Sequence, residues 1–370
     1  MKKRELPPLI AIAVILLGLS LATLLLPDRE FSPNENRYLQ QAPRLTADRI
    51  LSGRFTEEAE KYESDQVALR DMWMGTASVL QRAGGQQDIN GVYLGKDGYY
   101  FAKLTEDEFD QTQYEKNLQA VRTFFDDHTD LDCRVLMAPT PSEILPELLP
   151  ANAPVYDAAA RHAQLAETVG EERVIDVHEA LSQFQEPYYR TDHHWTTEGA
   201  YAAYAVWCQT TGRQMRPNMY SVDATNEFRG TLYSKVLLPD SAYDTIYLPQ
   251  DITIRSMDCD GTVTDSLYDR SKLEEKDKYA VFMGGNWAKV TINTGTENGR
   301  HLLLVKDSFA NSFVPFLTTH FETITMVDLR YFSDSLEELT EQQGITDVLV
   351  LYELSNFAAD RNIFKLKAAG

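Results

Sequence analysis

The sequence predicts an α/β fold with a mostly parallel sheet and helices on both faces. From about residue 88, short apolar segments alternate with longer segments whose apolar residues recur at helical spacing. Strands and helices that alternate at these lengths form βαβ units, in which the strands run parallel. The predicted strands are residues 135–138, 174–176, 279–283, 301–305, 324–327 and 347–352. The predicted helices are residues 110–127, 156–169, 198–212 and 333–343.

The N-terminal run of residues 9–26 contains no charged residue and consists mainly of Leu, Ile, Ala and Val. At 1.5 Å per residue a helix of this length just crosses a hydrocarbon core of ~30 Å. Lys2, Lys3 and Arg4 precede it, which favours a cytoplasmic N-terminus. We therefore predict a cytoplasmic tail (1–6), a single transmembrane anchor (7–26) and an extracytoplasmic remainder at the cell membrane. A cleaved signal peptide is the alternative.

Three further regions follow this run. Residues 27–85 form a predicted helical stalk or cap, broken near Gly53 and ended by two glycines. Residues 86–370 form the main domain, which opens with a hairpin signal, Gly-Lys-Asp-Gly at 95–98 between two apolar segments. Short β-prone pieces near residues 223–266 indicate an insertion that lines or covers a cleft.

Charge and cysteine content exclude several classes of function. The formal net charge is −21 and no basic stripe interrupts it, so nucleic acid is not a predicted partner. Cys133, Cys208 and Cys259 lack a metal-binding spacing, and buried free thiols are expected, with a Cys133–Cys208 disulfide as the alternative. No phosphate-binding or dinucleotide-binding glycine motif occurs, so no cofactor is predicted.

Two short segments carry the residues of a nucleophilic site. Asp192 stands two positions before His194, so in an extended segment both side chains point to one side. Ser308 follows the apolar strand 301–305 at the expected start of a helix, where backbone amides can meet an oxyanion. Acid, base and serine together meet the requirement of a catalytic triad. The alternatives are a structural Asp–His hydrogen bond and a plain serine N-cap.

The block Asp-His-His-Trp at 192–195, followed by Thr-Thr-Glu-Gly-Ala-Tyr, resembles the signature of the DHHW family of membrane-anchored bacterial proteins. That family is similar to the SGNH-hydrolase-like domains of alginate O-acetylation proteins, which carry the Asp-x-His-Trp block before the serine block, as here. Segments 31–37 and 92–98 fit as well, so the resemblance covers about residues 30–360. One departure is Lys306, where SGNH enzymes usually have glycine.

The resemblance implies an SGNH-like fold with Ser308 as nucleophile, His194 as base and Asp192 as its orienting acid. It also implies Gly285 and Asn286 as oxyanion donors, although an ordinary Gly-Gly-Asn turn is the alternative. The implied activity is O-acyl transfer, in particular acetyl transfer, to a cell-surface or exported polysaccharide, or ester hydrolysis on it. A membrane-bound acyl-exporting partner is implied too. Lys306 favours the alternative, a non-catalytic glycan-binding or scaffold module.

Three further predictions concern the surroundings of this site. Side-chain alternation turns His193 away from Asp192 and His194, so His193 supports the site or contacts substrate. Tyr189 is a candidate for stacking on a sugar ring, with a core position as the alternative. Residues 139–143 follow a strand and form a candidate substrate loop. No metal site is predicted at 192–194, because adjacent histidines on a strand do not readily face one ion.

Overall fold

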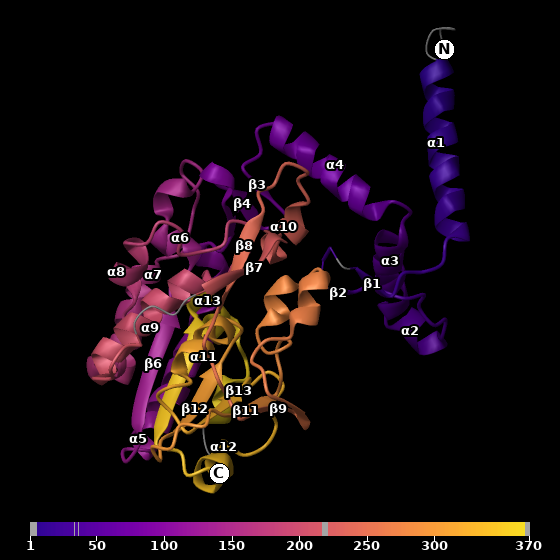
Figure 1. Cartoon of the computed structure of the whole chain (residues 1–370). Coiled ribbons are helices and arrows are strands. Elements are labelled where there is room, and N and C mark those ends of the chain that lie inside the picture. The colour runs from indigo at the N-terminus through magenta and orange to yellow at the C-terminus, as the bar shows by residue number, and fades with distance from the viewer. Residues whose placement is uncertain (1–5, 33, 36, 217–220, 367–370) are drawn as a thin grey trace.

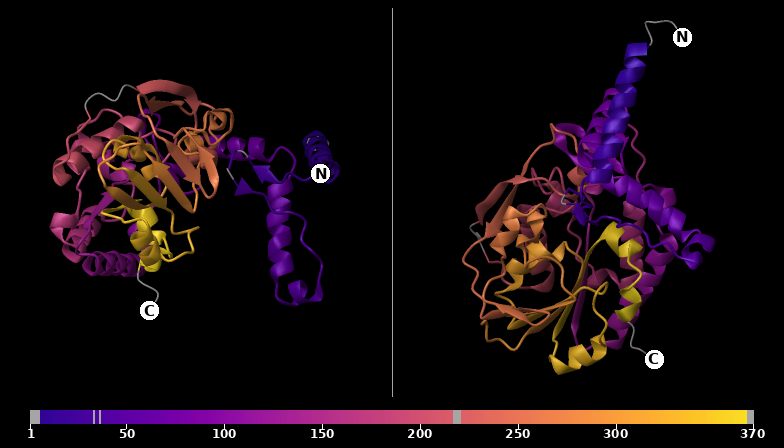
Figure 2. Two further views of the ribbon diagram at one scale, coloured as in Figure 1. Left: turned by 60° about the horizontal axis from the view of Figure 1, so that its bottom comes forward. Right: turned by 90° about the vertical axis from the view of Figure 1, so that its right-hand side faces the viewer.

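The computed structural model describes residues 6–32, 34–35, 37–216 and 221–366. A sheet-containing body holds most of the chain, and the first helices, within residues 6–66, stand away from it (Figures 1 and 2). The body confirms the predicted α/β class, with helices packed against the sheet.

The main sheet has the strand order β10-β9-β11-β13-β12-β14-β6. The last four strands of that order are parallel neighbours, and the first three extend the sheet in antiparallel fashion. The bounds are β6 (Asp132–Ala138), β9 (Ser256–Cys259), β10 (Thr262–Thr264), β11 (Lys289–Asn293), β12 (His301–Lys306), β13 (Thr323–Val327) and β14 (Asp347–Glu353).

The central strand β12 explains why helices cover both faces. Leu302 and Leu304 belong to one buried cluster, whereas Leu303 and Val305 belong to another. The first cluster includes residues of α9 (Thr197–Thr211) and α11 (Ala310–Leu317). The second includes residues of α5 (Gln111–Asp127), α7 (Ala158–Val169), α12 (Leu336–Gln342) and α13 (Leu354–Ala359). A continuous apolar run is typical of a parallel strand buried on both sides.

Two predicted strands differ in the structure. Residues 278–281 form the 3₁₀ helix η6 (Lys278–Val281), which is followed by three residues with positive φ, Met283, Gly284 and Gly285. Such a turn cannot continue a strand, which is why the prediction for 279–283 is wrong. At 174–176 only Val174 pairs, in an isolated bridge with Val135.

Smaller elements lie outside the main sheet. The predicted hairpin is confirmed, since β4 (Val92–Leu94) pairs with β5 (Tyr100–Ala102) and also with β3 (Asp88–Ile89). The region near 223–266 holds the antiparallel pair β7 (Ser221–Phe228) and β8 (Asp244–Pro249), with α10 (Thr231–Val236) between them. The remaining short elements are α6 (Pro141–Ile144), α8 (His178–Ser182), η1 (Lys96–Gly98), η2 (Glu106–Glu108), η3 (Pro146–Leu148), η4 (Glu171–Arg173), η5 (Arg270–Glu274) and η7 (Ile363–Leu366).

The N-terminal region contains the helices α1 (Leu6–Leu25), α2 (Ala47–Leu51), α3 (Arg54–Gln66) and α4 (Arg70–Ala83) and the pair β1 (Phe31–Ser32) and β2 (Arg37–Tyr38). Gly53 and Leu69 have left-handed φ values of 77° and 60° and separate the helices after α1. Arg37 binds the buried carboxylate of Asp65, with Nη1 2.9 Å from Oδ2, and thereby lowers the Asp65 pKa to about 2. This ion pair fixes the β1–β2 hairpin on α3.

The predicted membrane anchor at 7–26, and with it the single-pass cell-membrane localisation, is wrong. Among the described residues, none of the helices combines the length and the apolar character that a membrane span requires. Most of the tail predicted for residues 1–6 lies outside the described residues.

All three cysteines are buried free thiols, as predicted. The alternative Cys133–Cys208 disulfide is therefore not formed.

Candidate active site

The candidate site lies at the edge of the sheet where the four parallel strands end. Ser308 comes two residues after β12 and two residues before α11. Glu353 ends β14, and Thr140 follows β6. In open α/β sheets this edge is where ligands bind, because loops from several strands converge there.

The structure brings the three residues of the predicted triad together. The Oγ atom of Ser308 lies 2.7 Å from Nε2 of His194. The other ring nitrogen of His194, Nδ1, lies 2.5 Å from Oδ1 of Asp192. Asp192 and His194 are buried, and Ser308 is partly exposed. A continuous hydrogen-bond chain thus links a buried carboxylate to a serine hydroxyl.

The Asp192–His194 contact arises from a turn and not from strand alternation. Residues 190–194 form bends, and Oδ1 of Asp192 also accepts the backbone N–H of His194 at 3.0 Å. An aspartate that accepts a hydrogen bond from the amide two residues later closes an Asx turn. The prediction that His193 points away from Asp192 and His194 is wrong, because the chain turns here and does not run as a strand. The ring centroid of His193 lies 3.9 Å from that of His194.

Asp192 is held by the start of α10. Its Oδ2 accepts the backbone N–H of Thr231 at 2.8 Å and the Thr231 hydroxyl at 3.0 Å. A Cβ atom on Gly230 would lie 2.1 Å from that same oxygen, so only glycine fits there. Burial would raise the pKa of Asp192, but the nearby histidines and the donated hydrogen bonds hold it well below its ordinary value. The carboxylate is therefore charged at neutral pH.

His193 completes this arrangement in its neutral form. Its Nδ1 lies 2.7 Å from the Thr231 hydroxyl. Burial and the adjacent His194 lower the pKa of His193 to about 4. His193 thus stays uncharged beside the Asp192–His194 pair, in which His194 would take up the proton of Ser308.

Aromatic side chains fix the ring of His194. Tyr279 stacks on it at 3.8 Å between centroids, with 10° between the planes, and donates its hydroxyl to the carbonyl of Ser308 at 3.1 Å. Trp195, fully buried, donates its indole N–H to the carbonyl of Phe309 and to Ser312 Oγ, each at 3.0 Å. The two aromatic residues thus join the histidine loop to the turn that carries Ser308.

Asp307 shapes the turn at Ser308. It is buried and accepts the backbone N–H groups of Phe309 at 2.9 Å and of Glu353 at 3.0 Å. The amides of Ala310 and Asn311 donate to the carbonyls of Asp307 and Ser308. Three amides at the start of α11 are therefore committed to protein oxygens and are not oxyanion donors in this conformation.

The two predicted oxyanion residues behave differently. The amide of Gly285 donates to the carbonyl of Phe282 at 3.2 Å, so it is committed to the turn. Asn286 is exposed, and its Oδ1 accepts from Lys306 Nζ at 3.0 Å and from Asn311 Nδ2 at 3.2 Å. Both contacts occupy the oxygen, which leaves the Asn286 Nδ2 hydrogens as the donors. Lys306, fully buried at the end of β12, thus orients a side-chain amide near the serine turn.

Tyr189 is not placed to stack on a sugar. Its side chain is 2% exposed and packs edge-on against Phe228, with centroids 5.2 Å apart. The core alternative therefore describes it correctly.

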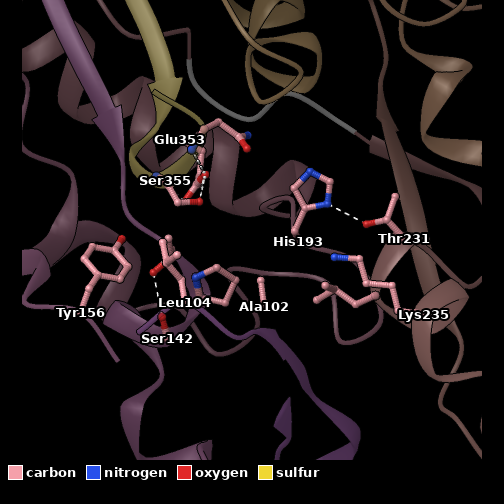
Figure 3. Close-up of a pocket in the computed structure, with 13 residues that line it drawn as sticks. Ala102, Leu104, Ser142, Tyr156, His193, Thr231, Lys235, Glu353 and Ser355 are labelled. Carbon is pink, nitrogen blue, oxygen red and sulfur yellow. Dashed lines mark hydrogen bonds between the residues drawn. The ribbon is translucent and has the colours of Figure 1, made fainter. Parts of the chain in front are cut away.

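A pocket adjoins the hydrogen-bond chain at His193 (Figure 3). Thr231 and Lys235 of α10 line one side, and Ser142 and Tyr156 line the other. Residues of the predicted substrate loop 139–143 and of the region near 223–266 thus share one cavity. Its lining residues are Ala102, Leu104, Thr140, Pro141, Ser142, Tyr156, His193, Thr231, Leu232, Lys235, Glu353, Ser355 and Asn356.

The ligand atoms of Asp192, His193 and His194 also lie close enough together to hold a metal ion. Such an ion would compete with the hydrogen bonds from Thr231 and from Nδ1 of His194, which already occupy both carboxylate oxygens. The donor set is therefore better matched to proton transfer than to metal binding.

Sequence reasoning missed Gly230, Thr231 and Tyr279. An Arg-Gly-Thr segment after a strand is the only sequence signal for the first two, and it does not indicate a partner. The sequence pattern predicts a strand at Tyr279, and the contact of Tyr279 with His194 depends on the tertiary fold.

Fold and site together define an α/β protein with a Ser-His-Asp hydrogen-bond chain at the carboxyl edge of its sheet. Residues 162–327 match the model of the DHHW protein family, which confirms the resemblance to that family. No curated protein sequence matches the chain.

Solved structures show the same fold. A DHHW family protein from Eubacterium siraeum is 24% identical with a TM-score of 0.62, and the match covers 75% of this chain and 95% of that one. Bacillus cereus PatB1, solved with a sulfonyl adduct, is 21% identical with a TM-score of 0.61 and is matched over 75% and 99% of the two chains. The O-acetyltransferase domain of Pseudomonas putida AlgJ is a more distant match, 16% identical with a TM-score of 0.46 over 73% of this chain and 93% of that one.

Proposed function

We propose that this protein is a serine-dependent acyltransferase that moves an acyl group, in particular acetyl, onto a hydroxyl of a cell-surface or exported glycan. The observation that carries the proposal is the continuous chain from Ser308 Oγ through both nitrogens of His194 to Asp192, at 2.7 and 2.5 Å. A neutral imidazole between a serine and a carboxylate takes up the serine proton during attack.

The reaction proceeds in two halves. Ser308 Oγ attacks the acyl carbonyl while Nε2 of His194 takes its proton, and the protonated His194 then gives that proton to the departing alcohol. In the second half a glycan hydroxyl, or water in the hydrolytic case, attacks the acyl-serine and loses its proton to His194. The serine oxygen leaves and recovers that proton. Asp192 keeps Nδ1 of His194 protonated, and the Asn286 amide stabilises the oxyanion.

The pocket supports an acceptor of this kind. It is lined by hydroxyl groups, one lysine and one carboxyl group, and sugar hydroxyls pair with such groups. The membrane-bound acyl-exporting partner stays a proposal that rests on the resemblance alone.

The test is hydrolysis of a chromogenic acetyl ester by the purified protein, with and without a glycan acceptor. Ser308→Ala should reduce the rate to background, whereas Ser64→Ala, an exposed serine of α3, should retain it. A sulfonyl fluoride should add its mass to the wild type and to Ser64→Ala but not to Ser308→Ala. Equal rates and equal labelling in all three would exclude Ser308 as the nucleophile. Glycan binding without turnover would favour the scaffold alternative.

A further inference from the structure

We propose that Glu143, His162 and His178 form a binding site for a divalent transition-metal ion, zinc in particular, separate from the Ser308 site. Glu143 lies on α6, just beyond the end of β6, His162 lies on α7, and His178 is the first residue of α8. Three helices that are separate in the sequence thus direct one ligand each to a common point.

The distances fit a zinc ion. Nε2 of His162 lies 3.0 Å from Oε2 of Glu143, and Nε2 of His178 lies 3.2 Å from the same oxygen. Zinc bonds to His and Glu are ~2.0–2.2 Å long, so neighbouring ligand atoms of a tetrahedral site stand about 3.3 Å apart. The two rings meet at 89°, with centroids 4.4 Å apart, which allows both Nε2 atoms to face one ion.

Two of the ligands are held from behind. Oε1 of Glu143 accepts the Thr140 N–H at 2.7 Å and the Tyr156 hydroxyl at 3.0 Å, which directs Oε2 to the histidines. Nδ1 of His178 lies 2.8 Å from Oδ1 of Asp176. A carboxylate behind the histidine keeps Nδ1 protonated and leaves the Nε2 lone pair for a metal, the arrangement typical of zinc sites.

The metal-free state requires a different arrangement of protons. Two imidazole nitrogens face one carboxylate oxygen, and each must donate a proton to it. His178, whose Nδ1 already donates to Asp176, must then be doubly protonated and cationic. One metal ion replaces both of these protons and leaves neutral imidazoles, which are the form that binds metal.

The site also has room for an exchangeable ligand. Three protein ligands leave one position of a four-coordinate ion open, and a cavity lined by His162 and Asp176 adjoins it. Because α6 also carries Pro141 and Ser142 of the pocket beside His193, an ion here fixes one wall of that pocket.

The test is calorimetric titration of the full chain, stripped with a chelator, with zinc chloride alone at pH 7.5. One ion per chain is expected, with a rise in Tm, and both should be lost in His162→Ala and in His178→Ala. His128→Ala, a partly buried histidine at the end of α5, is the matched control and should bind as the wild type does. Ser308→Ala should bind zinc normally, so that the site is judged apart from the proposed reaction.

Further measurements separate a metal site from a structural ion-pair network. Asp176→Asn should weaken zinc affinity about 10–100-fold, because the carboxylate supports a ligand without binding the ion. Cobalt(II) should give visible absorption in the wild type and none above background in the histidine variants, and this readout applies to any variant that folds. Absence of saturable zinc binding in the wild type, or unchanged binding in both histidine variants, would overturn the proposal.

Discussion

The two adjacent histidines at the site, His193 and His194, have different proposed roles, and single substitutions distinguish these roles. His194→Ala should reduce ester hydrolysis by ~10²–10⁴-fold, because proton transfer by a positioned base is worth that much. His193→Ala should cost far less, since it contacts Thr231 and the ring of His194 but receives no proton from Ser308. Initial rates with the chromogenic ester measure both. A larger loss in His193→Ala than in His194→Ala contradicts the assignment.

Gly230 offers a second test at a single residue. Gly230→Ala should impair activity without contacting any substrate, because the new Cβ would lie 2.1 Å from Oδ2 of Asp192. The Asp192 carboxylate must therefore move, which changes the tautomer and the orientation of the His194 ring. The expected result is a lower kcat with KM little changed. Circular dichroism should show a folded chain, and wild-type kcat in such a chain would argue against the role of Asp192.

The end of β12 determines how the proposed oxyanion donor is held. Asn286→Ala should lower kcat by ~10²–10³-fold, the typical cost of losing one such donor. Lys306→Met should cost less, because Asn311 Nδ2 still contacts Oδ1 of Asn286 at 3.2 Å. Steady-state kinetics of both single variants and of the double variant check this. A double variant no worse than Asn286→Ala shows that Lys306 acts through Asn286.

The contacts among α6, α7 and α8 predict a pH dependence of stability in metal-free protein. Burial lowers the pKa of His178, but hydrogen bonds to Asp176 and Glu143 raise it by more. The net effect is a pKa of about 9, above the ordinary value of 6.5. The folded state therefore binds the extra proton more tightly than the unfolded state. This stabilisation is complete below about pH 6.5 and is lost as the pH rises through about 9. Urea denaturation between pH 6 and 10 should show the loss in the wild type and not in His178→Ala.

On the scale of the whole molecule, the sequence predicted the features that depend on local pattern. Apolar runs identified the four parallel strands, and the Gly-Lys-Asp-Gly turn identified the hairpin. The order of Asp192, His194 and Ser308 indicated which residues would meet. Contacts that depend on distant segments were not predictable: Tyr279 stacks on His194 because η6 replaces a strand, and Thr231 binds Asp192 because α10 packs behind it. The polar, short strands β9 and β11 lacked a clear apolar run.

The strand order of the main sheet also has a consequence for synthesis of the chain. β6 is the first of its strands to leave the ribosome, yet β14, the strand beside it in the sheet, follows roughly 210 residues later. At translation rates of ~5–20 residues per second, the apolar edge of β6 waits about 10–40 s for its partner. Ser308 and the central strand β12 appear late in that interval. The nascent chain therefore spends most of its synthesis with an exposed edge on β6 and before Ser308 has been added. A chaperone that covers strand edges should raise the yield of soluble protein.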